Sequence, residues 1–447
     1  MRGKAKSKFA PILIVITVFL LTCGLAFFSA MQPTIHLATK AEVEAVIPKE
    51  LLQHRPVDPA ARKRYADLVA LAKRFDPAPS GPVRPIPVWS PGMVLEFDDA
   101  LSQGRIQIAN DSMMTEGMFL THNVVKALLQ TAETSRAIGD TESATRSLIL
   151  AAKFTTKVTN DAGIGISYSN VLGVDSLTST AIRKAAHNSK TSTETCKKLL
   201  EVLPTAPVTD DVLAADEANS FQSLTLPYLP NPFGDLKEEP FDDDKPPSPD
   251  ELPRFTHWKA PYDAMETARQ YAKVTSIRIA NTKRLLIDYD DSADQLVKQI
   301  ADSIPPDPDY STHWGPVKTW CRYKYRFVSN NSPNLFGRFL LSMNGNRRPR
   351  MLSSLRWRTM RNATRVLLAS RLYRSTHGGA LPPNAASFIT YLGTWPTDLY
   401  DGEPMRYDAN KQVVYSVGPN LKDDGGDIHG KPLETKDVGV SLKLDSN

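Results

Sequence analysis

The chain has 447 residues, of which 41% are hydrophobic, and this content is enough for one or more large hydrophobic cores. Its formal net charge is only +5, from 54 basic and 49 acidic residues. The composition excludes a disordered chain and argues against binding of nucleic acid through a generally basic surface, so no nucleic-acid partner is expected.

A long uncharged segment follows the basic N-terminus. Residues 9–31 contain no charged side chain, and four basic residues precede them, at positions 2, 4, 6 and 8. As an α-helix this segment would be about 34 Å long, which is enough to cross a bilayer. The positive-inside rule predicts that residues 1–8 are a cytoplasmic tail and that 9–31 are a single-pass anchor in the inner (cytoplasmic) membrane, with the bulk of the chain in the periplasm. A cleaved signal peptide is the alternative, although its apolar stretch is usually shorter.

The next two hundred residues divide into a proline-rich segment and a segment in which apolar residues recur at helical spacing. Residues 32–104 are rich in proline and predict a stalk, with one helical interval at residues 60–75. Residues 105–228 predict a helical domain, because apolar residues recur at helical spacing in two runs that break at Gly139 and Asp140. We expect Thr141 to cap the second helix of this hairpin.

Residues 229–256 are acidic and proline-rich, without apolar periodicity, and predict an exposed linker. Helical spacing returns within 257–350 and again in the run that begins near Leu352. Cys196 and Cys321 are far apart in the sequence and form no CxxC motif. They predict two buried free thiols, and a disulfide between them is the alternative.

The C-terminal residues predict a short strand and an acidic loop. Residues 413–417, VVYSV, favour a strand, and Gly418-Pro419-Asn420 favours a turn after it. Three carboxylates follow close to Gly425 and Gly426, namely Asp423, Asp424 and Asp427. Calcium prefers carboxylate and carbonyl oxygens on such a loop. The loop therefore predicts either a calcium site or a solvated turn.

This end of the chain resembles the globular region of the major pseudopilin of type II secretion. In that family, a long helix precedes a small antiparallel sheet, and an acidic, glycine-containing loop binds calcium. The matching residues, in order, are Asp398, Asp401, Gly402, Pro404, Tyr407, Ser416, Gly418, Asn420, Asp423, Asp424, Gly426 and Asp427. The chain as a whole also looks like membrane-anchored envelope proteins of planctomycete and verrucomicrobial type.

The resemblance implies a fold and a metal site at residues 351–447. It implies a pseudopilin-like α+β module there, with Asp423, Asp424 and Asp427 as calcium ligands. The N-terminus departs from the family, since no glutamate follows Gly3 at the position that pilins use. We therefore do not expect polymerisation through the anchor. The predicted fold class is α+β, mainly α, with an N-terminal transmembrane helix, a helical extracytoplasmic body and this small C-terminal module with its antiparallel sheet.

No catalytic motif is evident in the sequence. None of its eight histidines is paired at the spacing of zinc ligands on a helix, and neither a nucleophile elbow nor a phosphate-binding loop occurs. The catalytic residues of any enzyme here are therefore unknown. The sequence favours a structural or interaction protein, with partners in the envelope or in a type II secretion or pilus-like assembly. The alternative is a membrane-tethered periplasmic hydrolase of unknown substrate.

Overall fold

The computed structural model describes residues 35–52, 58–75, 86–106, 114–161, 168–206, 210–221, 226, 262–303, 334, 338, 341, 348–429 and 436–445. These residues belong to two compact units. The smaller unit takes its described residues from 1–48, 225–273 and 294–345, and the larger unit takes them from 49–224, 274–293 and 346–447. Each unit is described by itself.

The smaller unit contains a short parallel strand pair, one whole helix and parts of two others. Strands β1 (Ile35–His36) and β2 (Tyr262–Asp263) pair in parallel. The amide group of Asn334 ties β2 to the following helix, because its oxygen accepts from the Asp263 backbone N–H at 3.0 Å while its nitrogen donates to Thr267 at 2.9 Å. The helices are α2 (Lys40–Ala45), the first part of α11 (Ala264–Thr282) and most of α12 (Ser292–Ser303).

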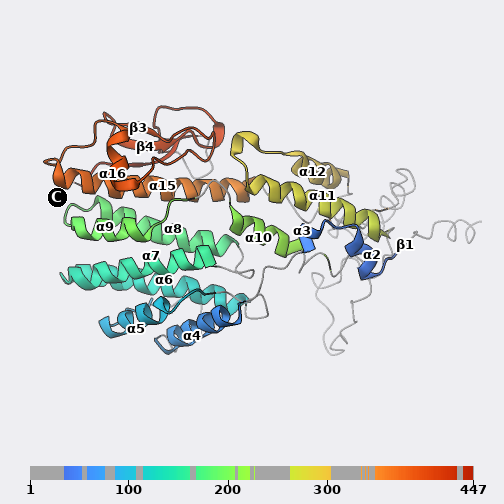
Figure 1. The fold of residues 1–447 in the computed structure, drawn as a ribbon, viewed down its shortest axis with the longest axis horizontal. Coiled ribbons are helices and arrows are strands. Elements are labelled where there is room, and N and C mark those ends of the chain that lie inside the picture. The colour runs from blue at the N-terminus through green and yellow to red at the C-terminus, as the bar shows by residue number, and fades with distance from the viewer. Residues whose placement is uncertain are drawn as a thin grey trace, which may run out of the picture. The chain divides into compact units, whose positions relative to one another are not determined.

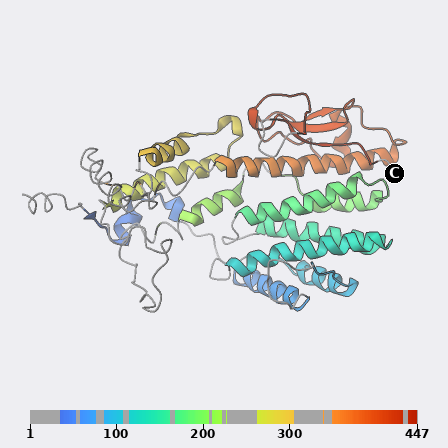
Figure 2. The same cartoon turned by 180° about the vertical axis from the view of Figure 1, so that it is seen from behind.

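The larger unit is built from helices and one small sheet. The helices are α3 (Lys49–Leu52), α4 (Pro59–Phe75), α5 (Pro91–Ser102), α6 (Met114–Ala137), α7 (Thr141–Asp161), α8 (Tyr168–His187), α9 (Thr193–Val202), α10 (Asp211–Ser220), α15 (Arg348–Thr376) and α16 (Ile389–Leu392). Strands β3 (Arg406–Asp408), β4 (Val413–Ser416) and β5 (Val438–Ser441) form an antiparallel sheet in the order β3-β4-β5. Figures 1 and 2 show its layers, with the sheet on α15, then α8 and α9, then α6 and α7, then α4 and α5.

The predicted helical hairpin is confirmed as α6 and α7, but its cap is a different residue. Gly139 has a φ of +83° and ends α6, and the Asp140 N–H returns to the Ser135 carbonyl at 2.8 Å. The Asp140 carboxylate then accepts from the Ser143 N–H at 3.0 Å. Asp140 is therefore the N-cap of α7, and the prediction of Thr141 was wrong by one residue.

Helix α5 lies within the residues for which a proline-rich stalk is predicted. Its sequence signal is local, because Ser90 accepts from the Met93 N–H at 3.3 Å and Pro91 occupies the first helical position. Proline at this position favours a helix start instead of preventing one. The predicted helical interval at 60–75 is confirmed by α4.

Helix α15 joins the sheet to the helical layers. One hydrophobic core contains Leu148 of α7, Leu199 of α9, Leu367 of α15 and Val414 of β4. On the helical side, arginines of α15 cap the carbonyl ends of two helices: Arg371 donates to the Ala186 carbonyl of α8 at 3.1 Å, and Arg365 donates to the Leu200 carbonyl of α9 at 3.2 Å. A single core thus includes segments for which separate domains are predicted at 105–228 and 351–447.

The predicted fold class is wrong. The described chain is mainly helical, with few strands and one small antiparallel sheet, and that sheet shares its core with the helical layers instead of forming an α+β module of its own. Among the described helices, none combines the length and the apolar composition that are needed to cross a membrane. The segment 9–31, the linker 229–256 and Cys321 lie outside the described residues. Cys196 is buried as a free thiol.

Candidate functional site

The predicted strand and turn are confirmed, and they position the acidic loop. Strand β4 ends at Ser416, and a 3₁₀ turn follows at Gly418–Asn420. Gly418 has a φ of +68°, and a Cβ atom there would lie 2.1 Å from the Lys436 carbonyl oxygen. Glycine is therefore required for the chain to turn beside β5.

The three predicted calcium ligands hydrogen-bond to different partners. Asp423 accepts from the Tyr415 hydroxyl at 3.1 Å and from the Gly425 N–H at 2.8 Å. Asp424 accepts from the side-chain amide of Asn420 at 2.9 Å. The third carboxylate, Asp427, forms an exposed ion pair with Lys436, and this pair lowers its pKa.

This arrangement does not itself form a calcium site. In the described part of the chain, no three His, Cys, Asp or Glu side chains lie close enough together to hold a metal ion. Calcium takes six to eight oxygen ligands at about 2.3–2.6 Å, so its binding would require the side chains of Asp424 and Asp427 to leave their present partners. The calcium site at Asp423, Asp424 and Asp427 stays a prediction.

A fourth carboxylate, which the sequence did not indicate, organises the loop. Asp437 is only 3% exposed and accepts from the Gly426 N–H at 2.7 Å and from the Asp424 N–H at 3.2 Å. Burial raises the pKa of Asp437, the two N–H groups oppose this shift, and repulsion by the carboxylates of Asp423 and Asp424 adds to it. Asp437 comes directly before β5 and reaches the loop only because β5 pairs with β4, so no local pattern could reveal its role.

A second polar network holds the segment before β3. Asp398 is fully buried and accepts from the Ser416 hydroxyl at 2.5 Å and from the Val417 N–H at 3.0 Å. Arg406 bridges Asp398 and Asp401, at 2.6 Å from each carboxylate. Asp398, Asp401 and Ser416, which carry part of the family resemblance, therefore stabilise the packing of this segment against β4.

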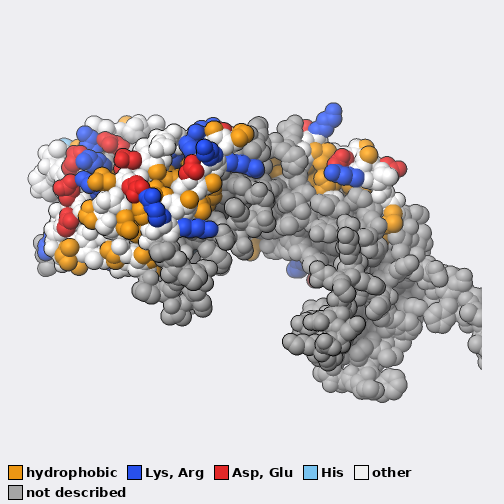
Figure 3. Space-filling model, turned by 90° about the horizontal axis from the view of Figure 1, so that it is seen from below, with side chains coloured by type: hydrophobic (Ala, Val, Ile, Leu, Met, Phe, Trp, Pro, Cys, Tyr) orange, Lys and Arg blue, Asp and Glu red, His pale blue; other side chains and the backbone are white. Residues whose placement is uncertain are grey.

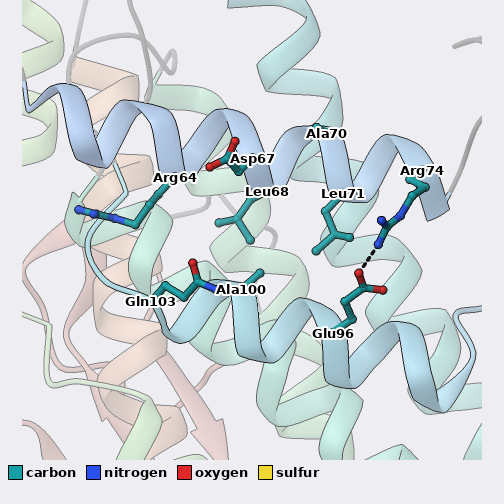
Figure 4. A pocket seen from close by; sticks show the side chains of 9 residues that line it. All are labelled: Arg64, Asp67, Leu68, Ala70, Leu71, Arg74, Glu96, Ala100 and Gln103. Carbon is teal, nitrogen blue, oxygen red and sulfur yellow. Dashed lines mark hydrogen bonds and ion pairs between the residues drawn. The ribbon is translucent and has the colours of Figure 1, made fainter.

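An open groove lies between α4 and α5, with a volume of about 400 Å³ (Figure 4). Leu68, Leu71 and Ala100 form its apolar floor. At one end Arg74 and Glu96 form an ion pair across the groove. Figure 3 shows this side of the molecule, where hydrophobic side chains lie among charged ones. The groove is a shallow surface with an apolar floor and a charged border.

Exposed apolar side chains also occur on α5 and just before it. Val88 is 50% exposed just before α5, and Leu95 is 45% exposed within it. The ring of Trp89, between them, packs against Phe75 and Phe97, with centroids 5.1 and 5.2 Å away. The rigid aromatic contact fixes this segment while its apolar neighbours remain accessible.

A second open groove, of about 520 Å³, lies between α9, α15 and α16. Its lining includes Lys197, Glu201, Arg365 and several hydroxyl side chains. Arg365 is not available to a ligand as a free cation, because it caps the end of α9. Neither groove has a pair of carboxylates at a common point, since Asp67 and Glu96 lie apart in the first (Figure 4) and Glu201 is the carboxylate of the second.

Comparison with known proteins adds no family to these observations. No protein-family model, no curated protein and no solved structure matches the chain.

Proposed function

We propose that the protein is an extracytoplasmic structural or interaction protein, and that the α4–α5 groove with its exposed neighbours is its binding surface. The observation that carries the proposal is the apolar floor of Leu68, Leu71 and Ala100, together with the exposed Leu95 on one of the two helices that form the groove. Apolar surface rimmed by polar residues is typical of surfaces that bind other proteins.

The proposed partner belongs to a type II secretion or pilus-like assembly. Support comes from the C-terminal residues, where a long helix carries a three-stranded antiparallel sheet and the residues of the resemblance lie before that sheet, within it and in the loop between β4 and β5. This part of the proposal rests on the resemblance and not on the groove, so the two are tested separately.

Site-specific photo-crosslinking in native cells tests the groove. A photoreactive residue at Leu95 should give one discrete cross-linked product, and the same residue at Ile138 should not. Ile138 is a suitable control because it is 77% exposed at the turn between α6 and α7. A second substitution, Leu71→Glu, places a charge on the groove floor and should remove the product while the helical circular dichroism stays unchanged.

Mass spectrometry of the product tests the partner. Identification of a secretion or pilus component would support the full proposal. Identification of any other single envelope protein would support the groove as a binding surface but would contradict a partner from that assembly. Equal products from Leu95 and Ile138, or none from either, would contradict the groove. The hydrolase alternative stays a prediction, and no described cleft favours it.

A further inference from the structure

The groove between α9, α15 and α16 has a small apolar lining and a polar border. Its apolar side chains, among the described residues, are Leu200, Leu372 and Tyr391, and the two leucines belong to the hydrophobic core that also contains Val414 of β4. Four exposed polar side chains also line the groove, and we call them the polar border: Thr193, Lys197 and Glu201 of α9 and Thr390 of α16. The groove is open, so it can receive a ligand that extends beyond it.

The ring of Tyr391 is held in place by the chain itself. It packs against the same core, and it meets the ring of Tyr373 edge to face, with the centroids 6.4 Å apart. Its hydroxyl lies 3.1 Å from the Thr376 hydroxyl, which is hydrogen-bond distance. Tyr373 is itself stacked on His377, with a centroid distance of 3.7 Å. The groove therefore presents an aromatic side chain whose position does not depend on a ligand.

The polar groups of the groove divide into those that the fold uses and those that are available to a ligand. Ser375 donates to the Leu372 carbonyl at 2.7 Å, and Arg365 caps α9, so both are used within the fold. The side chains of the polar border make no hydrogen bond or ion pair with any residue that the structure describes. They supply hydroxyl groups, an ammonium group and a carboxylate, and therefore both donors and acceptors.

The charge and the chemistry of this lining favour a neutral ligand with many hydroxyl groups. Lys197 and Glu201 have opposite charges and lie four residues apart on α9, so the polar border has no net charge with which to select an ion. The apolar lining is small, and it matches one face of a sugar ring better than the long apolar face of a helix. The negative face of an aromatic ring attracts the polarised C–H groups of a sugar.

We propose that the groove between α9, α15 and α16 binds a neutral oligosaccharide, with one sugar ring against Tyr391 and the sugar hydroxyl groups hydrogen-bonded to the polar border. β-Linked hexoses suit this arrangement, because they expose flat faces of C–H groups between their equatorial hydroxyl groups. The site shares no lining residue with the α4–α5 groove. Binding of a glycan here therefore does not depend on the protein partner proposed for that groove.

Isothermal titration calorimetry of the full-length protein with chitohexaose and with cellohexaose, two neutral β-linked oligosaccharides, tests this site. At least one of them is expected to bind at a single site, with an affinity that sodium chloride does not change, because neither probe is charged. Tyr391→Ala should weaken this binding about tenfold, because it removes the aromatic contact. Lys197→Met should weaken it several-fold, because it removes a hydrogen-bond donor and keeps the apolar stem. The matched control, Lys198→Met, changes a lysine that pairs with Glu194 at 3.6 Å and does not line the groove, and it should leave the affinity unchanged.

Three results would overturn the proposal. One is the absence of binding of both oligosaccharides at millimolar concentration. Another is parent affinity in a Tyr391→Ala protein whose circular dichroism shows it to be folded. The third is equal affinity of Lys197→Met and Lys198→Met, which would place the binding outside this groove. Both lysines are exposed on α9, so these two variants should fold, and they keep the test decisive if Tyr391→Ala unfolds.

Discussion

Two interfaces of the larger unit are held together by different physical means. Between α5 and α7, the ring of Phe97 packs against Phe154 at 5.5 Å and against Trp89 at 5.2 Å. Along α15, the buried Arg361 and Arg371 contact Asp175 and the carbonyl end of α8, and the half-buried Arg365 contacts the carbonyl end of α9. The first interface is apolar and non-directional, and the second depends on specific pairs.

This difference determines how each interface responds to substitution. Apolar contacts contribute roughly in proportion to the area that they bury, so losses accumulate as side chains are removed. A buried ion pair behaves otherwise, because removal of one partner leaves an uncompensated charge, whereas replacement of both by apolar residues removes the desolvation penalty as well. Double substitutions should therefore distinguish the two interfaces.

The largest effect is expected in the aromatic core. Phe97→Ala should lower the free energy of unfolding by about 3–5 kcal/mol, and Phe97→Ala with Phe154→Ala should lower it further, because a larger cavity is left. Urea unfolding measures both, with Leu95→Ala on the exposed side of the same helix as a control that should change stability by less than about 0.5 kcal/mol. A double variant no less stable than Phe97→Ala would contradict an additive apolar core.

The ion pair should show the opposite pattern. Asp175→Leu should lower the free energy of unfolding by about 3–5 kcal/mol, because the charge of Arg361 is left buried without its carboxylate. Adding Arg361→Met should recover much of that loss in the same urea experiment. If the double variant is less stable than Asp175→Leu alone, the interface behaves like the aromatic core and the comparison fails.

Calcium binding tests whether the acidic loop, like the ion pair between α8 and α15, depends on specific charged contacts. If Asp423, Asp424 and Asp427 bind the ion, calcium at a hundred times its dissociation constant should stabilise the protein by about 2.7 kcal/mol. Magnesium should do much less, and Asp424→Ala with Asp427→Ala should abolish the difference. No calcium binding by calorimetry at millimolar concentration would leave the loop as a solvated turn that Asp437 holds in place.

The smallest effect concerns the cap of α7 and its pH dependence. The Ser143 N–H lowers the pKa of Asp140, so the charged cap stabilises the folded state above the unfolded pKa, and this contribution is lost as the pH falls through the folded pKa. The stability difference between the parent and Asp140→Asn should therefore shrink below about pH 4. Parallel curves for parent and Asp140→Asn would contradict the cap.

Features that depend on near neighbours were predictable from the sequence. The β4 strand and its turn follow from Val413, Val414 and Gly418, and the hairpin break follows from Gly139, because side-chain shape and glycine's access to positive φ act locally. At this turn the predicted break was confirmed, but the predicted cap was wrong. Asp140 and Thr141 are both good capping residues, and only the backbone decides between them.

The tertiary structure alone decided where the buried charges find their partners. Asp437 reaches the acidic loop through strand pairing, and Arg361 meets Asp175 across nearly two hundred residues of chain. The sequence shows that α15 is rich in arginine, which on an isolated helix would indicate a solvated face. Whether a guanidinium group is buried against a carboxylate, caps a helix or lacks a partner depends on long-range packing, because Coulomb and hydrogen-bond energies depend on distances that local sequence does not set.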